Sequence, residues 1–130
     1  MPHLIVEYST NIEADVAPQQ ILDDFHAAAL ATGISEPVGV RTRLARREFY
    51  KLSDDGGDNA FMHITARLRR GRTAEQKKAL LAALLEQANK TLAPAFAARP
   101  LALTIEVHEI DPDFRVMRNG LRERAKLGAA

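Results

Sequence analysis

Apolar and polar residues alternate in four segments of the chain, a pattern typical of strands with one buried face. The predicted strands span residues 3–8, 38–50, 61–68 and 101–108. In the first strand, Leu4, Val6 and Tyr8 would face a core, and the residues between them would face away. The last strand has the clearest alternation, with apolar residues at Leu101, Leu103, Ile105 and Val107.

Two segments between these strands carry apolar residues at helical spacing. The first begins at Pro18, which suits the first turn of a helix, and ends at Gly33, which favours a helix stop. Its apolar stripe is Ile21, Leu22, Phe25, Ala29 and Leu30. The second begins at Thr73, with Gln76 placed to complete a capping box. Its apolar stripe is Leu80, Leu81, Leu84, Leu85, Ala88 and Leu92.

The elements therefore follow one another as β-α-β and then β-α-β again. We expect a single domain over residues 1–130, with halves at about 2–52 and 59–112 and a C-terminal extension at 113–130. This order predicts an α+β fold, a four-stranded sheet with two helices on one face. A ferredoxin-like fold has the same order of elements. The turn residues Asp55-Gly56-Gly57 would even favour a hairpin between the second and third strands.

The composition is that of an ordinary globular protein, with 46% hydrophobic and 27% charged residues. A net charge of +1 and the lack of a long apolar run predict neither a nucleic-acid nor a membrane partner. His3 and Glu7 interrupt the first apolar stretch, so we expect no signal peptide. The absence of cysteine fits a cytoplasmic protein. The four histidines lack metal-site spacing, so we expect no metal site.

Pro2 is a candidate general base at the start of the first strand. A methionine before a small residue is usually removed, and the chain would then begin with a secondary amine fixed in a ring. An ordinary α-amino group titrates near ~7.7–8.0, and burial or nearby positive charge lowers that pKa. An amine with a pKa near neutrality is a good general base. Many proteins begin with Met-Pro and have no such chemistry, so this feature is weak by itself.

Five short segments, in this order and spacing, resemble the 5-carboxymethyl-2-hydroxymuconate delta-isomerase family of the tautomerase superfamily. The segments are residues 2–7, 31–34, 39–43, 71–73 and 106–112. Residues 71–77 also resemble the helix start of 4-oxalocrotonate tautomerases. The resemblance extends from Pro2 to about Asn119, and nothing is carried over to the tail at 121–130.

The resemblance implies a tautomerase-type duplicated β-α-β fold whose mixed sheet has the two N-terminal strands at its centre. The hairpin suggested by the Asp55-Gly56-Gly57 loop would then be misleading. It also implies a cofactor-independent isomerase acting in aromatic-acid (homoprotocatechuate) catabolism. The substrate would be a dienol with two or three carboxylates, and Pro2 would move a proton from its 2-hydroxyl to a carbon, giving the 2-oxo-enoate.

Arg41 and Arg72 are the candidate carboxylate-binding residues. A guanidinium group binds a carboxylate at two points and keeps its charge at any working pH. Arg41 matches the family arginine on the second strand, and Arg72 precedes a helix whose free N–H groups would favour an anion. Arg43 is left undecided. Three further arginines are interpreted as solvated surface charges: Arg67, Arg69 and Arg70.

Other residue types favour structural interpretations over chemical ones. His3 and His63 lie opposite the apolar strand face, so we expect hydrogen-bonded structural histidines. Phe61 and Phe114 could line a pocket, but aromatic packing is the commoner role.

Two alternative functions stay open. One is another proline-dependent reaction of the superfamily, such as hydration or dehalogenation of an unsaturated acid. The other is a non-enzymatic ferredoxin-like module that binds a ligand or a partner. Such a module would tolerate an extended N-terminus, whereas the enzyme would not.

A homotrimer is the expected assembly. Two helices cover one face of a four-stranded sheet, and the opposite face would expose Ile5 and Phe61 among polar residues. The outer strands would also be unpaired edges, which proteins usually cover or join to a partner. The family resemblance implies that three copies close around an axis, with each active site near a subunit boundary.

Overall fold

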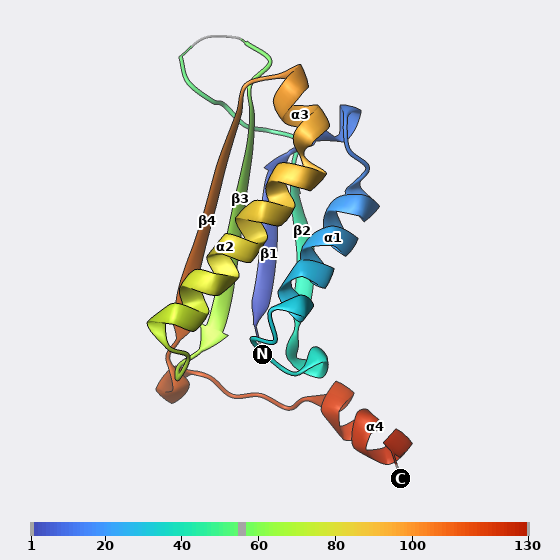
Figure 1. The fold of residues 1–130 in the computed structure, drawn as a ribbon, viewed down its shortest axis with the longest axis vertical. Helices are drawn as coiled ribbons and strands as arrows, with labels where there is room; N and C mark the ends of the chain where they lie inside the picture. Colours follow the sequence, from blue (N-terminus) through green and yellow to red (C-terminus); the bar gives the residue numbers. More distant parts are fainter. Residues whose placement is uncertain (1, 55–56, 130) are drawn as a thin grey trace.

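The computed structural model describes residues 2–54 and 57–129 and contains one mixed sheet of four strands (Figure 1). The strands are β1 (His3–Ser9), β2 (Arg41–Arg47), β3 (Ala60–Arg69) and β4 (Leu101–Ile110). Their order across the sheet is β2-β1-β3-β4. β1 runs parallel to β2, β3 runs parallel to β4, and β1 and β3 pair antiparallel at the centre.

This order confirms the duplicated β-α-β fold, with the N-terminal strand of each half, β1 and β3, at the centre of the sheet. The hairpin that the turn residues favoured between the second and third strands is not formed, because β1 lies between β2 and β3. Asp55 and Gly56 of the turn lie outside the described residues. β2 is also shorter than predicted: it begins later, because Pro37–Gly39 form a 3-10 turn before it, and it ends at Arg47. The alternating pattern cannot distinguish a strand from the extended residues beside it.

Both predicted helices are present and lie on the same face of the sheet (Figure 1). α1 (Pro18–Ala31) has its proline in the first turn, and Gly33 follows it with φ of +68°. That left-handed conformation costs glycine little, which explains why the helix stops there. α2 (Ala74–Thr91) begins with the predicted capping box between Thr73 and Gln76.

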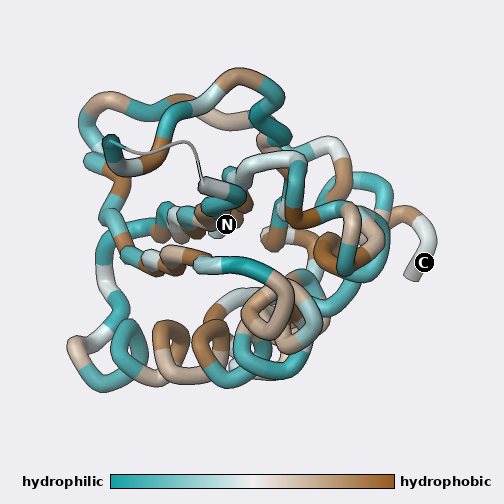
Figure 2. Tube along the Cα trace, turned by 90° about the horizontal axis from the view of Figure 1, so that it is seen from above, coloured by the Kyte–Doolittle hydropathy of each residue, from teal (hydrophilic) through white to brown (hydrophobic). Residues whose placement is uncertain are grey.

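The core lies between the sheet and these two helices. Most of its largest buried side chains come from alternate strand positions and from one stripe of each helix: Leu4, Val6, Tyr8, Ile21, Phe25, Met62, Ile64, Leu68, Leu80 and Leu84. Figure 2 shows the same alternation of hydrophobic and hydrophilic residues along the chain. Leu85 differs from the prediction, because this residue is 48% exposed at the edge of the α2 stripe.

The C-terminal extension has a structure that the sequence pattern did not predict. After β4, a 3-10 turn at Pro112–Phe114 leads into a segment that crosses the end of the sheet toward β2 (Figure 1). We call residues 111–119 the C-terminal arm. The arm ends in α4 (Gly120–Ala129), where Arg122 Nη2 lies 3.0 Å from Glu36 Oε2. A short helix, α3 (Ala93–Ala98), was also not predicted.

Within the described part of the chain, none of the helices has the length and apolar character needed to cross a membrane.

Candidate functional site

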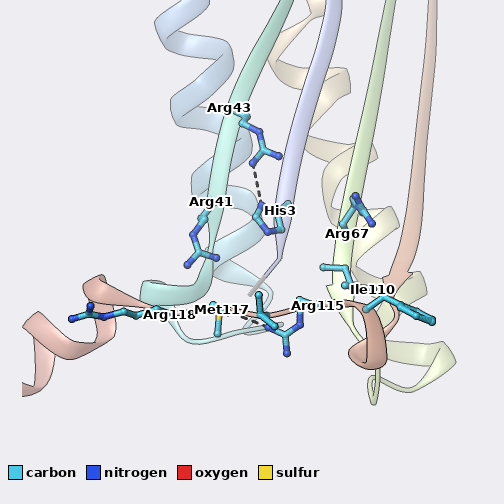
Figure 3. Close-up of a pocket in the computed structure, with 10 residues that line it drawn as sticks. His3, Arg41, Arg43, Arg67, Ile110, Arg115, Met117 and Arg118 are labelled. Carbon is cyan, nitrogen blue, oxygen red and sulfur yellow. Dashed lines mark hydrogen bonds between the residues drawn. The ribbon is translucent and has the colours of Figure 1, made fainter.

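A cavity of about 520 Å³ lies where β1 and β2 begin and β3 and β4 end (Figure 3). Half of its lining residues come from the strands and half from the C-terminal arm: His3, Arg41, Arg43, Arg67, Ile110, Phe114, Arg115, Val116, Met117 and Arg118. The arm therefore forms one wall of the cavity, and the uncovered face of the sheet forms the other.

The strand register explains why residues far apart in sequence meet here. His3 pairs with Arg41 on the parallel side of β1 and with Arg67 on the antiparallel side. Residues paired across neighbouring strands point to the same face of a sheet, so these three side chains share the face that the helices leave uncovered. Arg43, two residues along β2, lies on that face as well.

The cavity carries a strong positive charge. Five arginines line it, and no aspartate or glutamate does. Among residues 2–54 and 57–129, the guanidinium groups of Arg41 and Arg67 make no hydrogen bond or ion pair. Arg118 is paired with Glu123, which lies outside the lining. Guanidinium groups without a local counter-charge favour an anion, and carboxylates fit their planar geometry.

His3 lies in this cavity and has a defined hydrogen bond. Its Nδ1 atom lies 3.1 Å from Nη1 of Arg43 (Figure 3). A guanidinium group can only donate, so Nδ1 accepts and the ring proton of the neutral imidazole is on Nε2. Burial, followed by the charges of Arg43, Arg41 and Arg67, lowers the pKa of His3 below its ordinary value. The side chain is hydrogen-bonded as expected, but its place in the cavity was not predicted.

Pro2 is buried at the entry to β1, next to the cavity. Its carbonyl oxygen accepts a hydrogen bond of 3.0 Å from the backbone N–H of Arg41, which fixes the start of β1 against β2. Pro2 is not among the lining residues, but His3, which follows it, is. The expected removal of Met1 concerns a residue outside the described part of the chain.

Arg72 lies apart from the other candidate arginines. Its Nη2 and Nε atoms donate to the Ile34 carbonyl oxygen at 2.8 and 3.2 Å, and its Nη1 donates to the Arg69 carbonyl oxygen at 3.4 Å. These bonds tie the chain after α1 to the turn before α2. The structure thus brings Arg41 together with His3 and Arg43, while Arg72 is outside the cavity lining.

Arg67 and the arginines of the arm are the site residues that sequence reasoning missed. Arg67 was interpreted as a solvated charge; it is exposed, and it also lines the cavity. Its pairing with His3 follows from the order of strands, which periodicity does not reveal. Phe114 also lines the cavity, whereas Phe61 packs edge-to-face on Tyr50 with ring centroids 6.2 Å apart.

A second polar cluster occupies the same sheet face on β3 and β4, and its His108 is the register partner of Arg67. His63 Nε2 and His108 Nε2 each lie 3.0 Å from Glu106 Oε1. Hydrogen bonds from His108 and then His63 lower the pKa of Glu106. His63 is thus hydrogen-bonded, as expected, and is outside the cavity. No group of three acidic or histidine side chains in the described residues could hold a metal ion.

Comparisons with known proteins agree on one family. The family model for 5-carboxymethyl-2-hydroxymuconate isomerase matches residues 2–125. The 5-carboxymethyl-2-hydroxymuconate Delta-isomerase of Escherichia coli is 29% identical over 121 residues, covering 93% of this chain and 96% of the relative. The crystal structure of a 5-carboxymethyl-2-hydroxymuconate isomerase from Deinococcus radiodurans R1 is 29% identical, with a TM-score of 0.85 over 95% of this chain and 93% of that one.

A more distant solved structure has the same fold. It is the symmetric trimer of a wild-type fused 4-OT, which is 20% identical with a TM-score of 0.63. The alignment covers 91% of this chain and 95% of that one.

Proposed function

The chain belongs to the 5-carboxymethyl-2-hydroxymuconate isomerase family, within the tautomerase superfamily, and we propose that it converts 5-carboxymethyl-2-hydroxymuconate to its 2-oxo-enoate isomer. The observation that carries this proposal is the cavity itself. Five arginines and no acidic residue line it, at the sheet end where Pro2 enters β1. Such a cavity suits a substrate that carries several carboxylates. The reaction would be a step of homoprotocatechuate catabolism.

In the proposed mechanism, Pro2 acts first as a base and then as an acid. Its nitrogen would take the proton from the 2-hydroxyl group, and the resulting dienolate would carry negative charge on oxygen and on alternate carbons. The same proton would then be delivered to a carbon, so that no atom is gained or lost. Arg41 would hold a substrate carboxylate next to this base, because the backbone N–H of Arg41 is hydrogen-bonded to the Pro2 carbonyl oxygen and keeps the two residues adjacent. The positive cavity would stabilise the dienolate.

The reaction can be followed directly by ultraviolet absorbance, because the conjugation of the substrate changes. We expect the purified protein to isomerise 5-carboxymethyl-2-hydroxymuconate after treatment with a metal chelator and with no added cofactor. A parallel assay with 3-chloroacrylate would test for dehalogenation. Halide release without isomerisation would favour another proline-dependent reaction of the superfamily. Binding of the dienol without turnover would favour a ligand-binding module.

A homotrimer is the proposed assembly. The sheet face opposite the helices includes Ile5 and Phe61, both half-buried in the single chain, and β2 and β4 are edge strands. The trimeric fused 4-OT supports the proposal by its similar fold. Light scattering should give a mass of about three times the 14.3 kDa of one chain. An active monomer of 14.3 kDa would contradict this assembly.

Arg72 is proposed as a second carboxylate-binding residue, and its contacts make this proposal testable. To bind substrate, its guanidinium would have to leave, or share, the carbonyl oxygen of Ile34. We expect Arg72→Ala to lower kcat/KM by about one to two powers of ten, the effect of losing a charge-assisted pair worth about 1.5–3 kcal/mol. Urea unfolding of the same variant measures its structural role. A lower free energy of unfolding with unchanged kcat/KM would show that Arg72 has a structural role, in which it stabilises the backbone at residues 34 and 69, and does not bind substrate.

A further inference from the structure

His3 is the lining residue closest in sequence to the proposed base Pro2. The mechanism proposed above uses Pro2 and Arg41 and assigns no role to His3. Its ring lies between arginines on both neighbouring strands, because Arg41 and Arg67 are its register partners and Arg43 bonds its Nδ1. A histidine in a substrate cavity can act as an acid, as a base or as a neutral hydrogen-bond donor. The charges around His3 discriminate between these three roles.

The groups facing His3 all favour the neutral imidazole. Arg41 and Arg43 face it from β2 and Arg67 from β3, while Arg115 and Arg118 of the arm line the same cavity. The carboxylate farther along β1, on Glu7, is paired with Arg47 at 2.8 Å. Positive neighbours disfavour a positively charged ring, and burial acts in the same direction. His3 therefore stays uncharged to a lower pH than an ordinary histidine.

The bond to Arg43 also decides which nitrogen of the neutral ring carries the proton. Nδ1 accepts from the guanidinium, so Nε2 is the donor. Arg43 thus both orients the ring and fixes its tautomer, as the hydrogen-bonded partners of histidines do in many active sites. Neutral imidazole is a very weak acid, so it can donate a hydrogen bond to an oxyanion without giving up its proton.

We propose that the Nε2–H of His3 donates a hydrogen bond to the substrate oxygen that loses its proton to Pro2, and that Arg43 is the positioning residue for His3. This inference rests on the proposed isomerase function. The 2-hydroxyl oxygen must lie within hydrogen-bond reach of the Pro2 nitrogen, and His3 is the next residue along the chain. As Pro2 removes the proton, negative charge develops on that oxygen, and the hydrogen bond from His3 strengthens. His3 keeps its own proton throughout.

The tautomer can be tested on the unmodified protein by ¹⁵N NMR of its histidine side chains. His3→Gln and Arg43→Gln variants assign the signals and test the coupling. We expect Nε2 of His3 to be protonated and Nδ1 to be unprotonated at neutral pH. Arg43→Gln should raise the pKa of His3, because a positive charge is lost, whereas Arg43→Lys should leave it nearly unchanged. A proton on Nδ1, a doubly protonated ring at neutral pH, or a pKa indifferent to Arg43→Gln would overturn the inference.

Kinetics test the hydrogen bond to the reacting oxygen. His3→Leu removes the donor, and loss of one donor to a developing oxyanion lowers kcat by about 10²–10³-fold. His3→Gln should keep much of the activity, since its amide can accept from Arg43 and donate to the substrate. His108→Gln is the matched control, because His108 lies on the same sheet face but outside the cavity. It should leave kcat unchanged.

The outcomes separate this inference from the proposed function. Light scattering and thermal unfolding establish that each variant is folded and assembled like the parent. If the parent protein isomerises the dienol and His3→Leu has the same kcat, the role of His3 is wrong and the function stands. If His3→Leu raises KM and leaves kcat unchanged, the hydrogen bond is to a substrate carboxylate and not to the reacting oxygen, which would also overturn the inference. If the parent protein shows no isomerisation, the proposed function fails whatever the tautomer of His3.

Discussion

Acetylation of the Pro2 nitrogen is expected to lower kcat/KM at least ~10²-fold, the lower range for general acid–base catalysis. An acetylated nitrogen is an amide, whose lone pair is delocalised into the carbonyl group and cannot accept a proton at working pH. A retained Met1 would have the same effect, because Pro2 would again be part of an amide. The measurement is kcat/KM on protein whose acetylated fraction is known from its intact mass.

The matched control for this experiment is Pro2→Ala. Alanine leaves a primary amine at the same position, so we expect partial activity that acetylation then removes. The intact mass of the active parent should correspond to a chain that begins at Pro2. Full activity in completely acetylated protein, or in protein that keeps Met1, would exclude Pro2 as the proton shuttle.

Arg41→Ala is expected to lower kcat/KM by about one to two powers of ten. Its guanidinium lies in the cavity, makes no hydrogen bond or ion pair among the described residues, and is attached to the backbone that positions Pro2. Removing it takes away a charge-assisted contact to a substrate carboxylate without breaking a bond within the protein. The free energy of unfolding should therefore stay close to that of the parent.

Arg69→Ala provides the matched control for Arg41→Ala. It makes the same change in net charge from an exposed position at the end of β3, outside the cavity lining. We expect its kcat/KM to remain near that of the parent. Equal losses in both variants would indicate a general electrostatic effect on a charged substrate, and Arg41 would then have no specific contact.

The local parts of the fold could be predicted from sequence because their signals are local. Alternation at Leu4, Val6 and Tyr8 reports the buried face of β1, and Thr73 with Gln76 reports the start of α2. Strand order is a property of the whole chain, and here it came from the family resemblance. The turn residues around Gly57 favoured pairing of β3 with β2, whereas β3 pairs with β1. Turn residues indicate only that the chain reverses, and they do not determine which strands become neighbours in the sheet.

The candidate site was predicted in part, for a related physical reason. Pro2 and Arg41 follow from motifs at the start of two strands, and the structure places them in contact through their backbones. Arg67 could not be selected from its own surroundings in sequence, because only its pairing with His3 brings it to the cavity. The arm had no periodic pattern to detect. Val116, for example, is 99% exposed in a segment that has no repeating apolar face.

Because the arm forms one wall of the cavity and follows the sheet in sequence, the two parts become available at different times during synthesis. When a ribosome has released residues 1–110, every strand of the sheet is available and both β-α-β units can pair. Five of the ten lining residues, however, lie between residues 114 and 118. The anchor between Arg122 and Glu36 comes later still. The candidate cavity would therefore be completed last, after the sheet that supports it, and a nascent chain would have its sheet before it has both walls of the cavity.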